Sequence, residues 1–159
     1  MIQAFEPPDT SFVTSGQRFI LAQLDRLILV LPANLVLDTL LIRRFQILSM
    51  PFYPAAILGC LHHGGELVPL VNVDRLLGIA TGLTREQLTV IRLGESAEKF
   101  AGVGLVVDRV LGTQMGEQLP PELFEAELYF PDTENGTTFK LFHPQLLNSE
   151  MFVPLRWVH

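Results

Sequence analysis

Short runs of apolar residues, broken by glycine, proline and charged pairs, follow one another from residue 17 to the end of the chain. Runs of four to eight residues bounded by such turn residues are typical of β-strands, whereas long helical periodicity is almost absent. The pattern therefore predicts an all-β fold of about ten strands. We expect them at residues 18–24, 27–31, 35–42, 55–63, 66–73, 88–93, 101–107, 109–115, 128–131 and 138–142.

The clearest of these elements is a hairpin closed by Gly64-Gly65. A glycine pair between two β-rich runs supplies the positive φ that a two-residue turn requires. After the second strand, residues 74–77 change to helical spacing, and Gly78 is placed to end that turn. A similar short helix is expected at residues 145–148, because Pro144 suits a first helical position.

The strand spacing predicts how the chain is organised. Strands every 8 to 12 residues favour a barrel or a sandwich, and residues 30–36 and 106–111 look like apolar strands that bend and continue. We interpret residues 1–16 as a flexible lead-in and residues 17–159 as one domain, with one lobe at about 17–84 and a second at about 85–159. Each lobe alone would be marginally stable, so we expect them to pack together with a groove between them.

Composition excludes several classes of function. Of the 159 residues 48% are hydrophobic and 18% charged, and the net charge of −6 disfavours binding to nucleic acid or to an anionic membrane. The uncharged stretch at residues 45–65 contains Pro51 and Pro54, so it would make a poor membrane helix and we expect no direct membrane insertion. One cysteine and no secretory signal at the start of the chain favour the cytoplasm.

Candidate catalytic chemistry is sparse. Cys60 and His62 alternate on one predicted strand and would share a face, and His143 could join them, so a small metal-dependent enzyme remains an alternative. Zinc sites, however, usually have four ligands, with a CxxC or similar spacing in the sequence, and this sequence lacks such a spacing. There is also no GxSxG elbow and no complete dinucleotide fingerprint. We expect no enzymatic activity, no cofactor and no resident metal.

Binding to other proteins is favoured instead. Apolar residues lie near the predicted loops, namely Leu35, Leu37, Phe45, Phe52 and Tyr53. Soluble proteins rarely expose large apolar patches unless a partner covers them. We expect partners to dock on apolar strand edges and in the groove between the lobes.

Four stretches resemble the CheW-type coupling proteins of bacterial chemotaxis, in that family's order. They are LVLPANLVLDTL at 29–40, AAILGCLHHGGELVPLVNVDRLLG at 55–78, VGLVVDRVLG at 103–112 and LFHPQLLNSEM at 141–151. The resemblance implies two five-stranded, SH3-like β-barrels side by side, with short helices after the last strand of each lobe. It also implies a non-enzymatic adaptor in chemotaxis or pilus-based motility, whose partners are a CheA-type histidine kinase and methyl-accepting chemoreceptors.

The same resemblance implies partner-binding positions. Val36 and Asp38 match partner-contacting positions beside the groove, and the hairpin with Leu61, His62, His63 and Gly64 matches the one used for receptor coupling. The family's hairpin typically reads Asn-Leu-Arg-Gly, so its arginine is replaced here by Gly64, and its next aspartate by Asn72. These departures suggest a divergent member, serving surface or pilus-based motility rather than flagellar swimming.

Overall fold

The computed structural model describes residues 16–79, 85–125, 130–132 and 136–155. Short strands make up most of this part of the chain, as the apolar pattern predicts. The strands are β1 (Arg18–Leu24), β2 (Leu27–Pro32), β3 (Val36–Arg43), β4 (Ile47–Leu48), β5 (Ile57–His63), β6 (Glu66–Asn72), β7 (Gln87–Leu93), β8 (Gly104–Val107), β9 (Arg109–Met115), β10 (Phe130–Asp132) and β11 (Thr137–Leu141).

The helices are short. A single α-helical turn, α2 (Val73–Leu76), follows β6 and is ended by Gly78 with φ +75°. The 3-10 turns are η1 (Ala33–Leu35), η2 (Arg44–Gln46), η3 (Glu95–Phe100), η4 (Gly116–Gln118), η5 (Pro121–Phe124), η6 (Pro144–Leu146) and η7 (Ser149–Phe152). None of the helices in these described ranges is long and apolar enough to cross a membrane.

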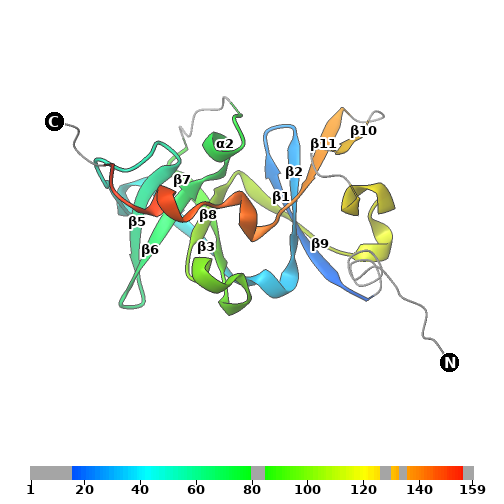
Figure 1. Ribbon diagram of the computed structural model, residues 1–159, viewed down its shortest axis with the longest axis horizontal. Helices are drawn as coiled ribbons and strands as arrows, with labels where there is room; N and C mark the ends of the chain where they lie inside the picture. Colours follow the sequence, from blue (N-terminus) through cyan, green and yellow to red (C-terminus); the bar gives the residue numbers. More distant parts are fainter. Residues whose placement is uncertain (1–15, 80–84, 126–129, 133–135, 156–159) are drawn as a thin grey trace.

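The strands form two sheets that lie side by side (Figure 1). Sheet A has the order β10-β11-β2-β1-β9, and sheet B has the order β3-β7-β8-β6-β5-β4. Most neighbours are antiparallel, but β11 pairs with β2 and β6 pairs with β8 in parallel. The predicted all-β fold with two lobes and few short helices is confirmed.

The chain passes between the sheets at the two bends that the sequence predicts. β2 in sheet A ends at Pro32, and η1 leads into β3 of sheet B. β8 of sheet B is followed after Asp108 by β9 of sheet A. Each sheet therefore combines strands from before and from after residue 84. The boundary between the sheets does not follow the expected division of the sequence near that residue.

Several details differ from the sequence prediction. The third strand begins at Val36 because residues 33–35 form η1, and the two-residue strand β4 and the turn η3 were not predicted. Residues 128 and 129 of the expected strand at 128–131 lie outside the described residues, and so do residues 1–15 of the expected lead-in. The expected short helix after Pro144 is the 3-10 turn η6.

The largest apolar cluster lies between the two sheets. It takes alternate residues of β2, such as Leu29 and Leu31, together with Ile91 of β7 and Leu105 of β8. Their neighbours point the other way, so Val30 packs in a cluster within sheet A's lobe, and Val106 packs in a cluster within sheet B's lobe. Strands buried on both faces read as continuous apolar runs, which explains these segments of the sequence.

The segment Gly104–Val110 carries part of the family resemblance, and packing and hydrogen bonding explain two of its residues. A Cβ on Gly104 would lie 2.7 Å from Cγ1 of Val90 and 2.9 Å from Cδ2 of Leu70, so only glycine fits between β6 and β7 without a shift. The Asp108 carboxylate accepts a hydrogen bond of 2.7 Å from the backbone N–H of Asp25, which has φ +56° in the β1–β2 turn. Asp108 thereby ties the two sheets together.

We predict that Gly104→Ala destabilises the fold by about 1–3 kcal/mol, because the added methyl group overpacks a closed core. Gly94→Ala is the matched control, since a Cβ there meets Leu37 at an ordinary 3.6 Å and Gly94 has φ −95°. Urea denaturation of both variants measures the difference. Equal midpoints for the two variants would contradict the packing argument.

Candidate functional site

The β5–β6 hairpin presents the first group of candidate residues. His63 pairs with Glu66 across a two-residue turn in which Gly64 has φ +57° and Gly65 has φ +82°. Positive φ at both central residues is the geometry of a tight hairpin turn, so the expected role of the glycine pair is confirmed. His62, His63 and Gly64 are exposed, and their polar and backbone groups are therefore available to a partner.

Leu61 has a different position from the other candidates on the hairpin. Its side chain is only 2% exposed and packs in the cluster inside sheet B's lobe with Val68 and Leu88. Residues alternate along a strand, so Leu61 faces inward while Cys60 and His62 face outward. Leu61 anchors the hairpin on the lobe, and its side chain does not reach the surface.

Val36 and Asp38 lie at the start of β3, which is an edge strand of sheet B. Val36 is partly buried and packs against the cluster between the sheets. Between Val36 and Asp38 the pairing with β7 shifts by a β-bulge, so Leu37 has no partner residue in the register and is 59% exposed. Bulges re-aim side chains at sheet edges, and this one turns a leucine toward the outside.

Asp38 forms an ion pair with Arg92, the residue opposite it on β7. Nε of Arg92 donates to Oδ1 at 2.7 Å, and Nη2 donates to Oδ2 at 2.5 Å. This two-pronged arrangement fixes the guanidinium in the plane of the carboxylate. The Arg92 side chain is 12% exposed and that of Asp38 is 39% exposed, so the pair is half-buried at the surface of the sheet.

The electrostatics link this pair to the hairpin tip. The pKa of Asp38 lies below its ordinary value, mainly because Arg92 donates hydrogen bonds to the carboxylate; burial opposes this, while the charges of Arg92 and His63 support it. The pKa of Arg92 is raised, mainly by the hydrogen bonds to Asp38 and also by the charges of Asp38 and Glu66, against the effect of burial. His63 and Glu66 at the hairpin tip therefore lie within electrostatic range of the start of β3.

We call Asp38, Arg92, His63 and Glu66 the tip cluster. Its members come from four strands: Asp38 from β3, Arg92 from β7, His63 from β5 and Glu66 from β6. The sequence did not identify Arg92, although an arginine inside the apolar run at residues 88–93 is a usable signal, since a charged side chain in a buried strand needs a partner. The sequence could not show which acidic residue would pair with Arg92.

The alternative metal site receives no support from the geometry. Cys60 and His62 face the same side of β5, whereas His143 follows β11 of the other sheet. Within residues 16–79, 85–125, 130–132 and 136–155, no three or more His, Cys, Asp or Glu side chains are grouped closely enough to hold a metal ion. The pKa of His143 is lowered, first by burial and then by Lys140, which disfavours its protonated form without making it a ligand.

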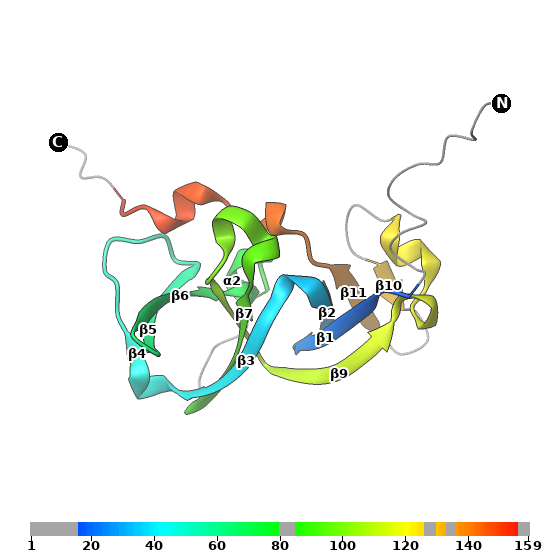
Figure 2. The same ribbon diagram turned by 90° about the horizontal axis from the view of Figure 1, so that it is seen from below.

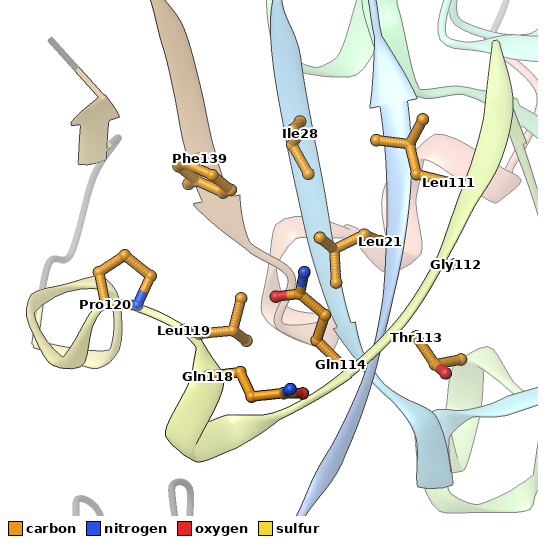
Figure 3. Close-up of a pocket in the computed structure, with 10 residues that line it drawn as sticks. All are labelled: Leu21, Ile28, Leu111, Gly112, Thr113, Gln114, Gln118, Leu119, Pro120 and Phe139. Carbon is orange, nitrogen blue, oxygen red and sulfur yellow. The ribbon is translucent and has the colours of Figure 1, made fainter. Parts of the chain in front are cut away.

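Sheet A carries an open pocket of about 380 Å³ (Figure 3). Leu21, Ile28 and Phe139 approach it from β1, β2 and β11, and Gln114 and Gln118 add two amide groups. The combination of apolar side chains with amides that both donate and accept suits a peptide segment better than a charged molecule. No acid-base pair lines this pocket.

The expected exposure of apolar residues near loops is partly confirmed. Leu37, Phe45 and Phe52 are more than half exposed, whereas Tyr53 is partly buried and Leu35 is 8% exposed. Leu35 was expected at the surface, but its side chain packs in the cluster between the sheets. It is the last residue of the 3-10 turn η1, just before β3 begins.

Comparison with known proteins identifies the family. The model of the CheW-like domain matches residues 18–129, which is more than half of the chain, and the chain therefore belongs to the CheW-like domain family. Among solved structures it is similar to the scaffolding protein TtCheW from Thermoanaerobacter tengcongensis, with a TM-score of 0.58 and 14% identity over 79% of this chain and 88% of that one. No curated protein sequence matches the chain.

The ion pair predicts a pH-dependent contribution to stability. We expect Asp38→Asn to lower the free energy of unfolding at neutral pH by about 0.5–1 kcal/mol, the range of a partly exposed pair. The folded-state pKa of Asp38 is depressed, so its contribution is complete above the ordinary value of 3.8 and is lost as the pH falls through the folded-state pKa.

Chemical denaturation at several pH values measures this effect, with Glu95→Gln in the exposed turn η3 as the control for removing one carboxylate. The difference between wild type and Asp38→Asn is expected to shrink at acidic pH. A difference that is the same at every pH would refute the electrostatic origin.

Proposed function

We propose that the chain is a non-enzymatic adaptor that acts in the cytoplasm and couples methyl-accepting chemoreceptors to a CheA-type histidine kinase in chemotaxis or pilus-based motility. The observation that carries this proposal is membership of the CheW-like domain family over residues 18–129. The structure supports it in that an edge strand and a hairpin present exposed residues on which a partner can dock. The output of such an adaptor is a change in the activity of its partner.

The hairpin tip is the proposed contact to the receptor. His62, His63 and Gly64 project from a hairpin whose base is fixed by Leu61 in the lobe interior. A tight turn on a packed hairpin loses little conformational entropy on binding, which favours even a small contact. The two imidazoles can donate or accept single hydrogen bonds, and the backbone at Gly64 is open, because a Cβ there would meet no atom within 4 Å.

The start of β3 is the second proposed contact. Val36 and Asp38 lie on an edge strand whose outward residues Leu37 and Leu41 are 59% and 65% exposed. An edge strand with exposed leucines offers a partner both backbone hydrogen bonds and apolar contact. Because Asp38 is held by Arg92, it presents an ordered polar group on the same strand.

Each contact is expected to be weak when measured alone. A hairpin tip and part of one edge strand form a small interface, on the order of 1,000 Å² or less, which is typical of transient signalling contacts. Repetition in an ordered assembly raises the effective concentration of each site, so that the array is stable although single pairs dissociate.

The test is binding of the folded chain to the CheA-type kinase and to receptor signalling domains of the same genome. We expect His63→Glu to weaken receptor binding at least about tenfold, or 1.4 kcal/mol, because it removes the exposed imidazole from the hairpin tip and adds a third negative charge beside Asp38 and Glu66. Gln145→Glu in the exposed turn η6 adds the same charge on another part of the surface and is expected to change nothing.

Two results would sink the proposal. One is a folded wild-type chain, verified by its cooperative unfolding, that binds no kinase and no receptor at concentrations where weak pairs associate. The other is equal binding of wild type, His63→Glu and Gln145→Glu to the receptor, which would remove the hairpin tip from the interface.

A further inference from the structure

The strand β9 forms an open edge of sheet A. It pairs with β1 on one side, and no other described strand lies on its other side, as the second view shows (Figure 2). All residues of β9 are exposed except Val110 and Met115, which are partly buried. A strand edge with free backbone groups can pair with a strand of another chain.

Hydrogen bonds at the end of β9 indicate which of its backbone groups point outward. The N–H of Gly116 donates to the carbonyl of Gln17, just before β1, at 2.7 Å. Residues of an antiparallel strand alternate between those that bond the neighbouring strand and those that do not, so Met115 and Thr113 direct their N–H and carbonyl groups away from β1. The N–H of Met115 does donate outward, to Oε1 of Gln118 at 2.8 Å.

The side-chain amide of Gln118 therefore takes the place of the backbone amide of a further strand. It satisfies the N–H of Met115 and ends the open part of the edge there. Thr113 keeps an outward N–H and carbonyl, and no hydrogen bond of the described residues outside the pairing with β1 engages them. Next along the strand, a β-bulge leaves Leu111 without a partner residue on β1. The open edge thus runs from Leu111 to Thr113.

The pocket of about 380 Å³ lies directly beside this edge (Figure 3). Gly112 and Gln114 form part of its wall, and the apolar side chains of Leu21, Ile28 and Phe139 line it from the neighbouring strands. A Cβ on Gly112 would meet no atom within 4 Å, so there is open space beside the strand at this point. Glycine within a strand is often found where another backbone approaches closely. We call the edge from Leu111 to Thr113 together with this pocket the β9 site.

The chain next to the β9 site is negatively charged. Residues 116–125, which contain η4 and η5 and supply part of the pocket wall, include Glu117, Glu122 and Glu125 and no basic residue. All three glutamates are exposed. Opposite charges steer association and like charges oppose it, so a partner segment with lysine or arginine is favoured. The net charge of −6 also opposes the approach of a second copy of the chain.

The basic residues of the neighbouring strands do not cancel this charge inside the pocket. Arg109 lies at the far end of β9 and donates to a glutamine side chain of β1. Side chains alternate along a strand, so Arg18 faces away from the side of Leu21, and Lys140 faces away from the side of Phe139. The pocket is lined by Leu21 and Phe139, and neither Arg18 nor Lys140 lines it.

We propose that an extended, basic segment of a partner protein pairs with β9 from Leu111 to Thr113 and inserts one apolar side chain into the pocket. The backbone hydrogen bonds come from Thr113, the apolar contact from the pocket, and the preference for positive charge from the glutamates of η4 and η5. Addition of a strand to an exposed sheet edge is an established mode of peptide recognition, in which pockets for alternate side chains give the specificity. The β9 site lies on the other sheet from the hairpin tip and β3, so the proposal does not rest on the adaptor function.

Labelled peptides test the proposal on the full 159-residue chain. The probe is a fluorescein-labelled peptide Lys-Thr-Lys-Leu-Lys-Thr-Lys, with variants that carry Val or Phe in place of the central Leu. Fluorescence anisotropy is expected to show saturable binding of at least one of them below about 1 mM protein. For the tightest of the three, replacing every Lys by Glu, replacing the central residue by Ala, or methylating two backbone nitrogens is each expected to weaken binding at least about tenfold.

A pair of protein variants tests the pocket. Gln114→Lys places a cation in the pocket wall and is expected to weaken binding of the basic peptide at least about tenfold. Gln145→Lys makes the same change in the exposed turn η6 and is expected to leave binding unchanged. Cooperative unfolding in urea verifies that both variants are folded.

Amide NMR spectra of the isotope-labelled chain locate the bound peptide. Its addition is expected to shift the signals of Leu111, Gly112 and Thr113 and to slow the hydrogen exchange of the Thr113 N–H. The signals of Leu37 and Leu41 on β3, the edge strand of the other sheet, serve as the internal control and are expected to stay in place.

Four outcomes would overturn the proposal. The first is no saturable binding of any basic peptide up to about 1 mM protein. The second is equal affinity for the basic, acidic and backbone-methylated peptides, or equal affinity of wild type and Gln114→Lys. The third is a set of shifts on β3 without shifts on β9. The fourth is protection of the Thr113 N–H that grows with protein concentration in the absence of peptide, which would assign the edge to a second copy of the chain.

Discussion

The apolar cluster between the two sheets is the contact on which the architecture depends. Each lobe has its own small interior, but residues such as Leu29, Ile91 and Leu105 turn to the opposite face of their strands and meet in the middle. Separating the lobes would expose these fully buried side chains to water. Burial of apolar area contributes roughly 25 cal/mol per Å², so this interface stabilises two lobes that are each too small to be stable alone.

The path of the chain reinforces this arrangement. The chain enters sheet A, crosses at η1 to sheet B, returns after β8 to sheet A, and crosses again after β11 so that η7 packs beside sheet B. With three crossings, neither lobe is a continuous piece of sequence. At the second crossing the Asp108 carboxylate also accepts a hydrogen bond from the backbone of the β1–β2 turn. The point where the chain changes sheet is therefore held by a hydrogen bond as well as by packing. A scaffold built in this way presents its hairpin and its edge strand at fixed positions.

Local signals in the sequence were sufficient for the elements but not for their partners. Apolar runs and turn residues predict most strands, and Gly64-Gly65 predicts the hairpin turn, because these features depend on residues close in sequence. The bends at Pro32 and at Asp108 were also visible as apolar runs that change direction. The assignment of strands to sheets was not visible in the sequence, because β2 pairs with β11, which lies more than a hundred residues away along the chain. For the same reason the sequence could propose Asp38 but not its partner Arg92, and it could not show that Leu35 and Leu61 turn inward.

The charge pattern of the tip cluster bears on what replaces the arginine that the family resemblance places at position 64. Arg92 cannot take over that role, because its guanidinium already donates two hydrogen bonds to Asp38 and is only 12% exposed. An arginine on the hairpin would bring five donors in one plane, whereas His62 and His63 offer single donors or acceptors from separate rings. Asp38 lies close to His63 and Glu66 lies close to Arg92, so a partner that fits this surface has to bring hydrogen-bond donors of its own. The proposed recognition accordingly depends more on shape and apolar contact along β3 and the hairpin than on one dominant ion pair.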